Sequence, residues 1–533
     1  MTDETILSLL QATPGWAAQA DRAGLDDTGV AQILDEARKL AEAVLDPLAG
    51  VADAEHCRIE SGRVKTPAGY PETYRRFGAD GWICADLDPD FGGMGLPLAL
   101  HVAASLPFEG AAMPFMMALG SSRAGAHLLA ELAPDLRDVW CPRLAAGDWA
   151  VTICISEPDA GSDVGRIRTK AVKDGGTWRL SGTKCWISFG DHDMTDRIGH
   201  LALARTGTPE EGTRGLSLFL VPNITDDGAD NGIRVERIEE KLGLHGSPTC
   251  VMRFEDSLGT MIGAPGRGLA QLFTMIELMR LQVGGQGAGI ILRCAALARA
   301  YAEDRKQGGS PKSPPVPIIS HPDVQRQLLA IDAQAAVTTA LMFEAAVAVE
   351  EGRTDAGMQA YAAFLLPLAK TFCGEGAQEA TSATIQVLGG AGYTREWSAE
   401  RLFRDARICT IYEGTTGMQG QDFLFRRLLK DQGAGLKALG DRMRGELGEG
   451  PGIDLLAQFE ALSERLAKAS ASAQLAAADG YLRAGWAAVS ACLAQRVAGL
   501  GGERAAAADY WLALAPARFG MAEAQVTYAL AKG

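Results

Sequence analysis

The sequence predicts a mainly α-helical protein with a β domain in the middle of the chain. Apolar residues recur at helical spacing in residues 1–147 and 263–432, whereas residues 148–262 hold short runs rich in β-branched and aromatic residues. Glycine, asparagine, aspartate and proline separate these runs, as is typical of a compact antiparallel barrel or sandwich. Residues 455–532 are alanine-rich and helical again, which indicates an added helical domain within residues 433–533.

Composition and charge fit a globular protein with a large buried core. Of the 533 residues, 47% are hydrophobic and 22% are charged, and the formal charge of −15 argues against non-specific binding to nucleic acids. The ten cysteines lack metal-ligand spacing, so we expect no metal site and small buried thiols in a reducing compartment. The acidic N-terminus and the absence of a long uncharged apolar run predict a cytoplasmic protein without membrane insertion.

Helices are expected along the N-terminal domain. Helical spacing predicts one over residues 30–48, with Pro47 near its end as a stop, and the strongly apolar residues 98–106 and 113–132 predict buried helices. A methionine cluster is interpreted as core packing, with a pocket for a substrate tail as the alternative. It consists of Met113, Met116 and Met117.

The β domain and the segments after it are also marked by local patterns. Strands are expected at residues 149–155, 166–172, 177–180, 185–188, 201–205, 216–221, 233–238 and 251–254. Residues 270–302 then predict a long helix, and the proline-rich residues 308–317 predict a surface loop. Helical patterns continue with breaks from residue 322 to 430, and the glycine-rich, charged residues 433–452 indicate a linker.

Glu413 is the carboxylate on which a catalytic hypothesis depends. It follows the apolar residues 408–411 and precedes Gly414, so it is expected in a short loop with apolar neighbours. Such neighbours disfavour the charged form and raise a carboxyl pKa, which suits a general base near neutral pH. A solvated loop glutamate is the competing interpretation. Thr415 or Thr416 is expected to cap the helix that follows.

Two linked motifs identify a family resemblance. Residues 411–416 (IYEGTT) with Gln419 resemble the catalytic-glutamate signature of the acyl-CoA dehydrogenases, and residues 386–393 (QVLGGAGY) stand upstream at the family's spacing. The resemblance implies the acyl-CoA dehydrogenase fold, in which an N-terminal helical domain, a middle antiparallel β-barrel and a C-terminal four-helix bundle follow one another. The implied domains are residues 1–147, 148–262 and 263–432, with residues 433–533 as the added helical domain.

The resemblance also implies an FAD site. Residues 153–163 (ICISEPDAGSD) and 181–188 (SGTKCWIS) resemble the family's flavin segments, in which Trp186 would stack on the flavin. Arg305 matches an arginine that reaches the FAD of a neighbouring subunit, which implies a homodimer or homotetramer; a surface arginine is the alternative. The implied cofactor-binding residues are Ile153, Ser156, Gly161, Ser162, Trp186, Ser188, Arg305, Gln386, Gly389, Gly390, Thr415 and Thr416.

Glu413 is the catalytic base implied by the resemblance. Some relatives carry the base immediately before the arginine that corresponds to Arg280, but that position is Met279 here, which cannot abstract a proton. The implied substrate-binding residues are Ser162, Glu277, Arg280, Tyr412 and Gly414. Two other features are set aside: the glycine-rich residues 284–289 are interpreted as close helix packing, and His245 as a turn residue.

The implied activity is FAD-dependent α,β-dehydrogenation of an acyl-CoA thioester to the 2-enoyl-CoA, with an electron-transfer flavoprotein as acceptor. Residues 241–250, 279–284 and 321–324 look most like the branch that contains 3-methylmercaptopropionyl-CoA dehydrogenase, so a short to medium acyl chain is expected. An acyl-CoA oxidase and a non-catalytic DNA-associated relative are the alternatives. Acidic residues mixed into the C-terminal helices argue against DNA binding.

Overall fold

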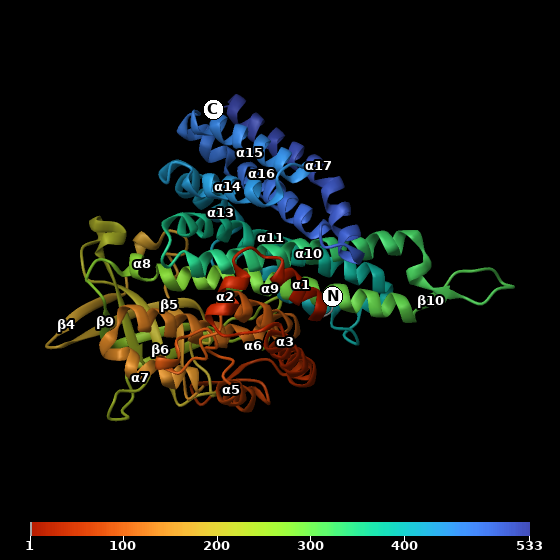
Figure 1. Ribbon diagram of the computed structural model, residues 1–533. Helices are drawn as coiled ribbons and strands as arrows, with labels where there is room; N and C mark the ends of the chain where they lie inside the picture. Colours follow the sequence, from red (N-terminus) through yellow and green to blue (C-terminus); the bar gives the residue numbers. More distant parts are fainter. Residues whose placement is uncertain (1–2, 533) are drawn as a thin grey trace. The chain divides into compact units, whose positions relative to one another are not determined.

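The computed structural model describes residues 3–532 and consists of two compact units (Figure 1). We call them the helical unit, formed by Met1–Lys39, Pro97–Ala111 and Arg280–Gly533, and the β unit, formed by Leu40–Leu96 and Ala112–Met279. The architecture of helices, a central β domain and further helices is that of the predicted fold class.

The β unit is built around one seven-stranded sheet. Its strands are β3 (Trp149–Cys154), β4 (Lys170–Asp174), β5 (Thr177–Ser188), β6 (Arg197–Arg205), β7 (Leu216–Pro222), β8 (Ile233–Ile238) and β9 (Thr249–Ile262). The order runs β3-β6-β4-β5-β9-β7, and β7 also pairs with β6, so five of the strands form a closed ring. Closure removes the unpaired edges that an open sheet would leave. The barrel is not wholly antiparallel, because β3 runs parallel to β6.

Shorter elements surround the barrel. They are η1 (Ala41–Leu45), α4 (Asp46–Glu55), β1 (Arg58–Glu60), β2 (Arg63–Lys65), α5 (Tyr70–Ala79), η2 (Pro89–Phe91), α7 (Pro134–Ala145), η3 (Val164–Arg166), η4 (Pro209–Gly215) and α8 (Gly268–Gln271). Two expectations were wrong here. Pro47 lies in the first turn of α4 rather than at a helix end, because proline lacks only an N–H that this position leaves unpaired anyway. The expected strand over 166–172 begins only at Lys170, after the 3-10 turn η3.

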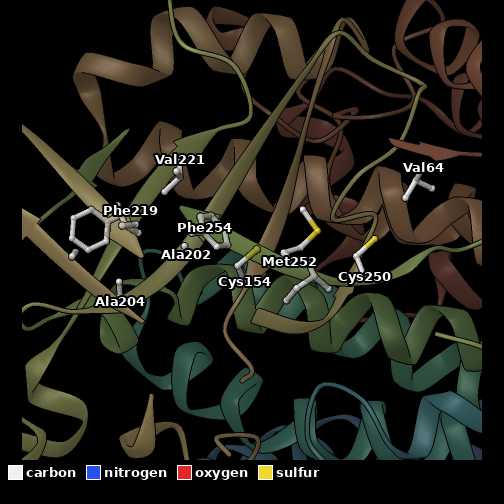
Figure 2. Packing of buried hydrophobic residues seen from close by; sticks show 12 residues of the cluster. Val64, Cys154, Ala202, Ala204, Phe219, Val221, Cys250, Met252 and Phe254 are labelled. Carbon is white, nitrogen blue, oxygen red and sulfur yellow. The ribbon is translucent and has the colours of Figure 1, made fainter. Parts of the chain in front are cut away.

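A cluster of buried side chains fills the barrel (Figure 2). Phe219 and Phe254 are at most 2% exposed and pack with sulfur-containing and small side chains from neighbouring strands. Alternate residues along a strand face the same side of a sheet, which is why Cys250, Met252 and Phe254 of β9 enter this one cluster. Fully burying each large apolar side chain stabilises the fold by roughly 1.5–3 kcal/mol.

The helical unit contains the remaining elements. They are α1 (Asp3–Gln11), α2 (Trp16–Arg22), α3 (Asp27–Leu40), β10 (Lys306–Gln307), β11 (Val316–Pro317), η5 (Ile318–Ser320), α10 (Pro322–Glu351), α11 (Ala356–Leu388), η6 (Gly389–Tyr393), α12 (Ala399–Ala406), η7 (Arg407–Thr410), α13 (Thr416–Gln421), η8 (Asp422–Lys430), α14 (Ala434–Leu447), α15 (Pro451–Ala467), α16 (Ala471–Ala498) and α17 (Gly502–Lys532). The chain passes between the units after Lys39 and after Leu96, and again within α6 (Leu98–Leu132) and α9 (Phe273–Asp304). The backbone of α6 is not helical at Ala112, and this kink separates the two helices expected over residues 98–106 and 113–132.

Glycines allow the long helices to approach closely. A Cβ at Gly287 of α9 would lie 2.3 Å from the carbonyl oxygen of Cys373 in α11, so no larger residue fits. Gly289 is equally close to α6, where a Cβ would lie 2.4 Å from the carbonyl oxygen of Leu106. The glycine-rich residues 284–289 therefore serve helix packing, as expected.

The C-terminal helices pack on the rest of the helical unit rather than trailing from a linker. Residues 433–452 were expected to be a linker, but α14 occupies most of them because Leu436, Leu439 and Met443 form a buried apolar face. Helix α16 packs against α17, α15, α10 and α13. An aromatic cluster of Phe364, Phe423, Phe459 and Tyr481 joins α11 and η8 to α15 and α16, with ring centroids 4.6–6.4 Å apart.

Burial explains two further sequence features. Helices α6 and α10 are long and apolar enough to cross a membrane by length and composition, but 89% and 83% of their apolar windows are buried within the folded protein. These are the properties of core helices. All ten cysteines are free thiols, and all except the half-buried Cys57 are buried, as expected.

Candidate active site

Glu413 lies in the short loop between η7 and α13. The amides of Ile411 and Tyr412 both donate to the carbonyl of Ile408, and helical geometry then ends. Glu413 has φ +51°, a left-handed conformation that is uncommon for residues other than glycine, and Gly414 follows with φ +91°. Backbone strain of this kind is held in place by surrounding contacts and is concentrated at functional sites. The loop therefore needs support from neighbouring side chains.

Three side chains supply that support. Lys370 of α11 is fully buried, and its Nζ donates to the carbonyl oxygen of Gly414 at 2.6 Å. Gln419 of α13 donates through Nε2 to the carbonyl oxygen of Glu413 at 2.9 Å. The hydroxyl of Thr416 donates to Oε1 of Glu375 at 3.3 Å. The expected hydroxyl cap is not made: Thr415 occupies the N-cap position of α13 without a side-chain capping bond.

The surroundings of Glu413 make its carboxyl a weaker acid than a surface glutamate. Burial raises the pKa of Glu413, and the positive charges of Arg280 and Lys370 oppose this shift without cancelling it. The side chain remains half-buried rather than fully enclosed. A half-open carboxyl with a raised pKa has the properties that a general base requires.

Arg280 is tied to Asp422. Its Nη1 donates to Oδ2 of Asp422 at 2.7 Å, and the two side chains are 12% and 6% exposed. Burial opposes ionisation of Asp422, but Arg280 and Arg427 outweigh it and lower the pKa of this carboxyl. The ion pair with Asp422 thus holds Arg280 close to Glu413.

A second buried carboxyl is connected to the residue before Glu413. The hydroxyl of Tyr412 donates to Oε1 of Gln286 in α9. Gln282, one turn earlier on α9, donates to Oε1 of Glu109 in α6 at 3.2 Å. Burial raises the pKa of Glu109 to about 8, an effect that hydrogen bonds from both glutamines reduce. Glu109 is therefore largely protonated at neutral pH and can act as a neutral hydrogen-bonding partner.

The added C-terminal helices reach the same loop. Arg483 of α16 donates to both carboxylate oxygens of Glu375, at 2.8 and 3.1 Å, and Glu375 in turn accepts from Thr416. Gly420 of α13 lies against α16, where a Cβ would approach the carbonyl oxygen of Ala478 to 3.0 Å. The helices after residue 433 thus contribute to fixing the loop that carries Glu413.

Two glycines end α11 in the upstream motif. Gly389 is the C-cap residue of α11 with φ +62°, and a Cβ at Gly389 or Gly390 would meet no atom within 4 Å. Gln386 and both glycines are exposed. This open stretch of backbone can be approached closely by a ligand. Arg305 follows the end of α9 and is also exposed.

The β unit carries the first flavin-like segment. The amide of Cys185 in β5 donates to the carbonyl of Ser156 at 3.0 Å, so this segment lies beside the end of β5. Lys184 is fully buried and donates to the carbonyl of Ile155 and to Oε1 of Glu157, both at 2.9 Å, which fixes the residues on either side of Ser156. Burial opposes ionisation of Glu157, but Lys184 and the amides of Arg168 and Thr169 together outweigh it and lower the pKa of that carboxyl.

Trp186 presents an open aromatic face in the same region. It is 63% exposed and has φ +62°, both unusual for a tryptophan within a strand. The hydroxyl of Thr152 donates to the carbonyl of Ser188 at 2.7 Å, which brings the ends of β3 and β5 together. The residues expected from the two flavin-like motifs all lie in the β unit. They are Ile153, Ser156, Gly161, Ser162, Trp186 and Ser188.

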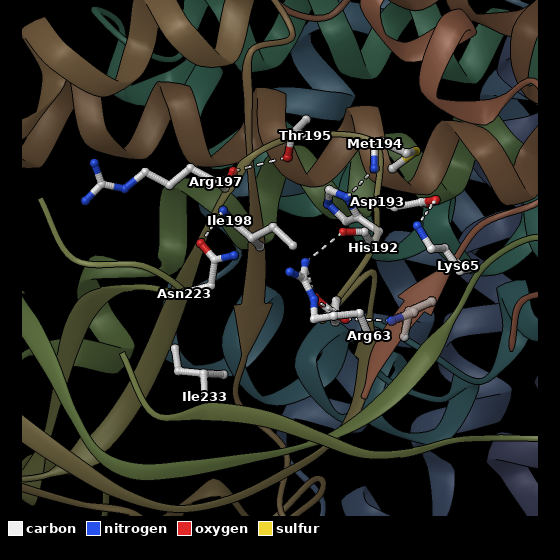
Figure 3. A network of polar contacts seen from close by, with 12 residues as sticks. Arg63, Lys65, His192, Asp193, Met194, Thr195, Arg197, Ile198, Asn223 and Ile233 are labelled. Atoms are coloured by element: carbon white, nitrogen blue, oxygen red, sulfur yellow. Dashed lines mark hydrogen bonds and ion pairs between the residues drawn. The ribbon is translucent and has the colours of Figure 1, made fainter. Parts of the chain in front are cut away.

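A polar network fixes the turn after Ser188 (Figure 3). Asp191 accepts from Nε of Arg63 at 2.8 Å and from the amide of Val64 at 2.7 Å. Arg63 also donates to the carbonyl of His192 at 3.1 Å, and burial lowers the pKa of His192 to about 3, so its ring is neutral. The β1–β2 hairpin thus anchors the turn next to the second flavin-like motif.

The expected residues divide between the two units. The helical unit brings together Arg280 and the loop residues Tyr412, Glu413, Gly414, Thr415 and Thr416. Glu277 is half-buried on the part of α9 that belongs to the β unit. Sequence reasoning missed the supporting residues. Among them, Lys370 had a usable signal, since it is a single lysine within the largely apolar residues 364–373.

The implied residues fit a bound FAD. Trp186 offers an uncovered ring for stacking on a flat heterocycle, and the hydroxyls of Ser156 and Ser188 lie on adjoining segments of the β unit. In the helical unit, the open backbone at Gly389 and Gly390 leaves room for a ligand phosphate. The uncovered aromatic ring is suited to stacking on a flavin, and the exposed glycine pair is suited to close approach of a phosphate.

Comparison with known proteins agrees with these features. The family models for the acyl-CoA dehydrogenase N-terminal, middle and C-terminal domains match residues 30–148, 152–257 and 266–428. The chain is 37% identical over 474 residues to 3-methylmercaptopropionyl-CoA dehydrogenase of Ruegeria pomeroyi, covering 86% of this chain and 79% of that protein. It is 34% identical to the broad-specificity linear acyl-CoA dehydrogenase FadE5 of Mycobacterium tuberculosis, covering 79% and 73%.

A solved structure shares the fold over nearly the whole chain. ACDH-11 of Caenorhabditis elegans, solved in complex with C11-CoA, superposes with a TM-score of 0.81 at 23% identity and covers 95% of this chain and 89% of that chain. The match therefore includes the helices beyond the three family domains. Fold, motifs and relatives agree, and the chain belongs to the acyl-CoA dehydrogenase family, whose members are FAD-dependent oxidoreductases acting on CH–CH groups.

Proposed function

We propose that this FAD-dependent acyl-CoA dehydrogenase acts on a short to medium acyl-CoA, with 3-methylmercaptopropionyl-CoA as the first candidate, and that Glu413 is its catalytic base. The relative of 37% identity, whose name gives that substrate, supports the choice of thioester. The similarity to a broad-specificity linear acyl-CoA dehydrogenase supports testing straight chains as well. The observation that carries the base assignment is the half-open Glu413 carboxyl with its raised pKa, held in a strained loop.

The residues of the chain divide the chemistry between them. The Glu413 carboxylate accepts a proton from the α-carbon of the thioester. The Glu413 N–H can donate a hydrogen bond to the thioester oxygen, where negative charge develops as the proton leaves. Gln419 binds the carbonyl oxygen of Glu413, and Lys370 binds that of Gly414. These hydrogen bonds direct both carbonyl oxygens toward Gln419 and Lys370 and so away from the developing negative charge. When bound, FAD supplies the acceptor for the hydride from the β-carbon.

Further residues are assigned to holding the ligands. We assign Trp186, Ser156 and Ser188 to the flavin ring, and Gly389 and Gly390 to the phosphates. The remaining assigned cofactor contacts are Ile153, Gly161, Ser162, Arg305, Gln386, Thr415 and Thr416. We assign Ser162, Glu277, Arg280, Tyr412 and Gly414 to the acyl-CoA. If Arg305 reaches the FAD of another subunit, the active form is a homodimer or homotetramer.

An anaerobic titration of the purified flavoprotein with acyl-CoA thioesters tests this proposal. We expect loss of the oxidised flavin absorbance with 3-methylmercaptopropionyl-CoA and with short straight-chain thioesters, and little change with long-chain ones. Flavin that no thioester bleaches would refute the proposed substrate class. Aerating the reduced enzyme distinguishes the two acceptors. Slow reoxidation by air with rapid transfer to an electron-transfer flavoprotein supports a dehydrogenase, whereas prompt reoxidation by air supports an oxidase.

A further inference from the structure

Lys370 is a buried cation that the family motifs did not single out. It lies on α11 between apolar neighbours, and its side chain is fully buried. Moving an ammonium group out of water is unfavourable unless hydrogen bonds or opposite charges compensate. Its hydrogen bond goes to the carbonyl oxygen of Gly414 at 2.6 Å, which is a neutral acceptor. Among residues 3–532, Lys370 forms no ion pair within 4.0 Å, so no carboxylate contacts its ammonium group directly.

The charged groups around Glu413 come from several elements. Arg280 of α9 and Lys370 of α11 both favour the ionised form of Glu413. Burial lowers the pKa of Lys370 to about 8, while Cys409 of η7, Glu413 and Glu375 act in the opposite direction. Lys370 therefore keeps its proton at neutral pH and loses it within an accessible pH range.

The two cations near Glu413 differ in how they are engaged. Arg280 is paired at 2.7 Å with Asp422, a carboxylate that also pairs with Arg426 and Arg427. Lys370 instead donates to a neutral carbonyl oxygen of the loop itself. Both cations favour the Glu413 carboxylate, Arg280 more strongly than Lys370, and Lys370 in addition holds a carbonyl group of the loop.

Lys370 also controls the geometry of the loop. The carbonyl that it holds belongs to Gly414, directly after Glu413, in a stretch where both residues have positive φ. Gln419 holds the preceding carbonyl at 2.9 Å. Together these two bonds set the orientation of the peptide groups on the C-terminal side of Glu413.

We infer that Lys370 is a positioning residue for the dehydrogenation: its ammonium fixes the peptide that follows Glu413 and supplies the positive charge beside the Glu413 carboxylate. This inference rests on the proposed role of Glu413 as the base. It adds a specific requirement, namely that the residue at position 370 must provide both a hydrogen-bond donor and a positive charge.

The test measures the rate of anaerobic flavin reduction by a bleaching thioester as a function of pH, in the FAD-loaded enzyme. Lys370→Gln keeps a donor for the Gly414 carbonyl but removes the charge. We expect the acidic limb of the pH–rate profile to move to a pH about one unit higher. The rate of flavin reduction should then fall about tenfold at pH values below the limb and by a smaller factor above it. Lys370→Arg keeps the charge, so its limb is expected within about 0.3 units of the wild type.

Matched controls keep the inference falsifiable. Lys437→Gln removes an exposed lysine on α14 that pairs with Asp441, and it is expected to leave the profile unchanged. Lys370→Met removes both charge and donor; the expected result is the same limb shift as for Lys370→Gln with a lower rate at every pH. If Lys370→Gln reduces the rate equally at all pH values, or not at all, while its limb stays in place, the inference is overturned.

A parallel Glu413→Gln enzyme separates this inference from the base assignment. If that variant reduces flavin at nearly the wild-type rate, the base assignment fails, and the role of Lys370 fails with it. If Glu413→Gln is inactive and the limb of Lys370→Gln does not move, only the inference about Lys370 fails. If a Lys370 variant does not retain FAD, Lys370→Arg is measured in its place. The acidic limb of its pH–rate profile must then remain at the wild-type position.

Discussion

Arg496→Met should destabilise the helical unit more than any exposed arginine substitution, because it breaks a buried ion network. Glu344 of α10 is fully buried and accepts from Nη1 of Arg496 at 2.7 Å, from the hydroxyl of Tyr361 at 3.1 Å, and from Arg442. Arg496, only 6% exposed, also donates to both oxygens of Glu446, at 2.5 and 2.6 Å. The network joins α10 to α14 and α16 of the C-terminal helices.

The magnitude follows from the burial of the charges. Removing one partner of a buried ion pair leaves an uncompensated charge and typically reduces the free energy of unfolding by about 3–5 kcal/mol. Because Arg442 still neutralises Glu344 in part, we expect the lower end of this range, about 3 kcal/mol. Arg465→Met is the matched control, since Arg465 pairs with Glu523 at 49% and 41% exposure and should contribute less than about 1 kcal/mol.

Urea unfolding at a fixed excess of FAD, followed by tryptophan fluorescence, measures the difference. Trp486 stacks on Phe372 with an interplanar angle of 7° and contacts Trp511, so these two of the nine tryptophans report on the C-terminal helices. The double variant Glu344→Met/Arg496→Met should regain part of the lost stability, because the buried carboxylate is gone. A loss for Arg496→Met no larger than that of the Arg465 control would refute the reasoning.

Three further predictions concern the cofactor and pH. Trp186→Ala should weaken FAD retention and shift the visible flavin spectrum, as measured by absorbance after dialysis, because the exposed ring is no longer available for stacking; an unchanged spectrum and flavin content would contradict the assignment. Arg305→Ala should lower flavin content without changing the thermal stability of the FAD-free protein, and full retention of flavin would argue against a shared cofactor site. Arg496 and Arg442 hold the pKa of Glu344 below its ordinary value despite burial. The contribution of Glu344 to stability should therefore be complete at pH 7 and shrink as the pH falls below about 4. The free energies of unfolding of the wild type and of Glu344→Gln should converge at that low pH.

The fold class could be predicted from the sequence because its elements carry strong local patterns. The strand runs of the β domain and the long apolar helices are visible as periodicity, and the structure confirms them. The predictions of element boundaries were wrong where one residue type is found in two kinds of structure. Pro47 can end a helix or begin one, and the glycines among residues 433–452 suggested a linker although Leu436 and Leu439 supply a buried face. Burial of that face depends on α11 and other distant elements, which no local pattern reveals.

The candidate site was predicted in part. Motifs at family spacing pointed to Glu413 and to the flavin-like segments, and the structure gives Glu413 the environment expected from its apolar neighbours. The residues that support the loop are separated from it along the chain, as Lys370 is from Gly414, or belong to the added helices, as Arg483 does. Such contacts arise only when the helices pack, so sequence spacing does not indicate them.

The central claim, that Glu413 removes the proton from the thioester, is tested most directly by Glu413→Gln. The amide keeps the size of the side chain and removes its ability to accept a proton. Anaerobic stopped-flow measurement of flavin reduction by a bleaching thioester should show wild-type FAD content with a rate reduced by at least about 10³-fold. A variant that binds FAD and reduces it at a rate within about tenfold of the wild type would contradict the claim.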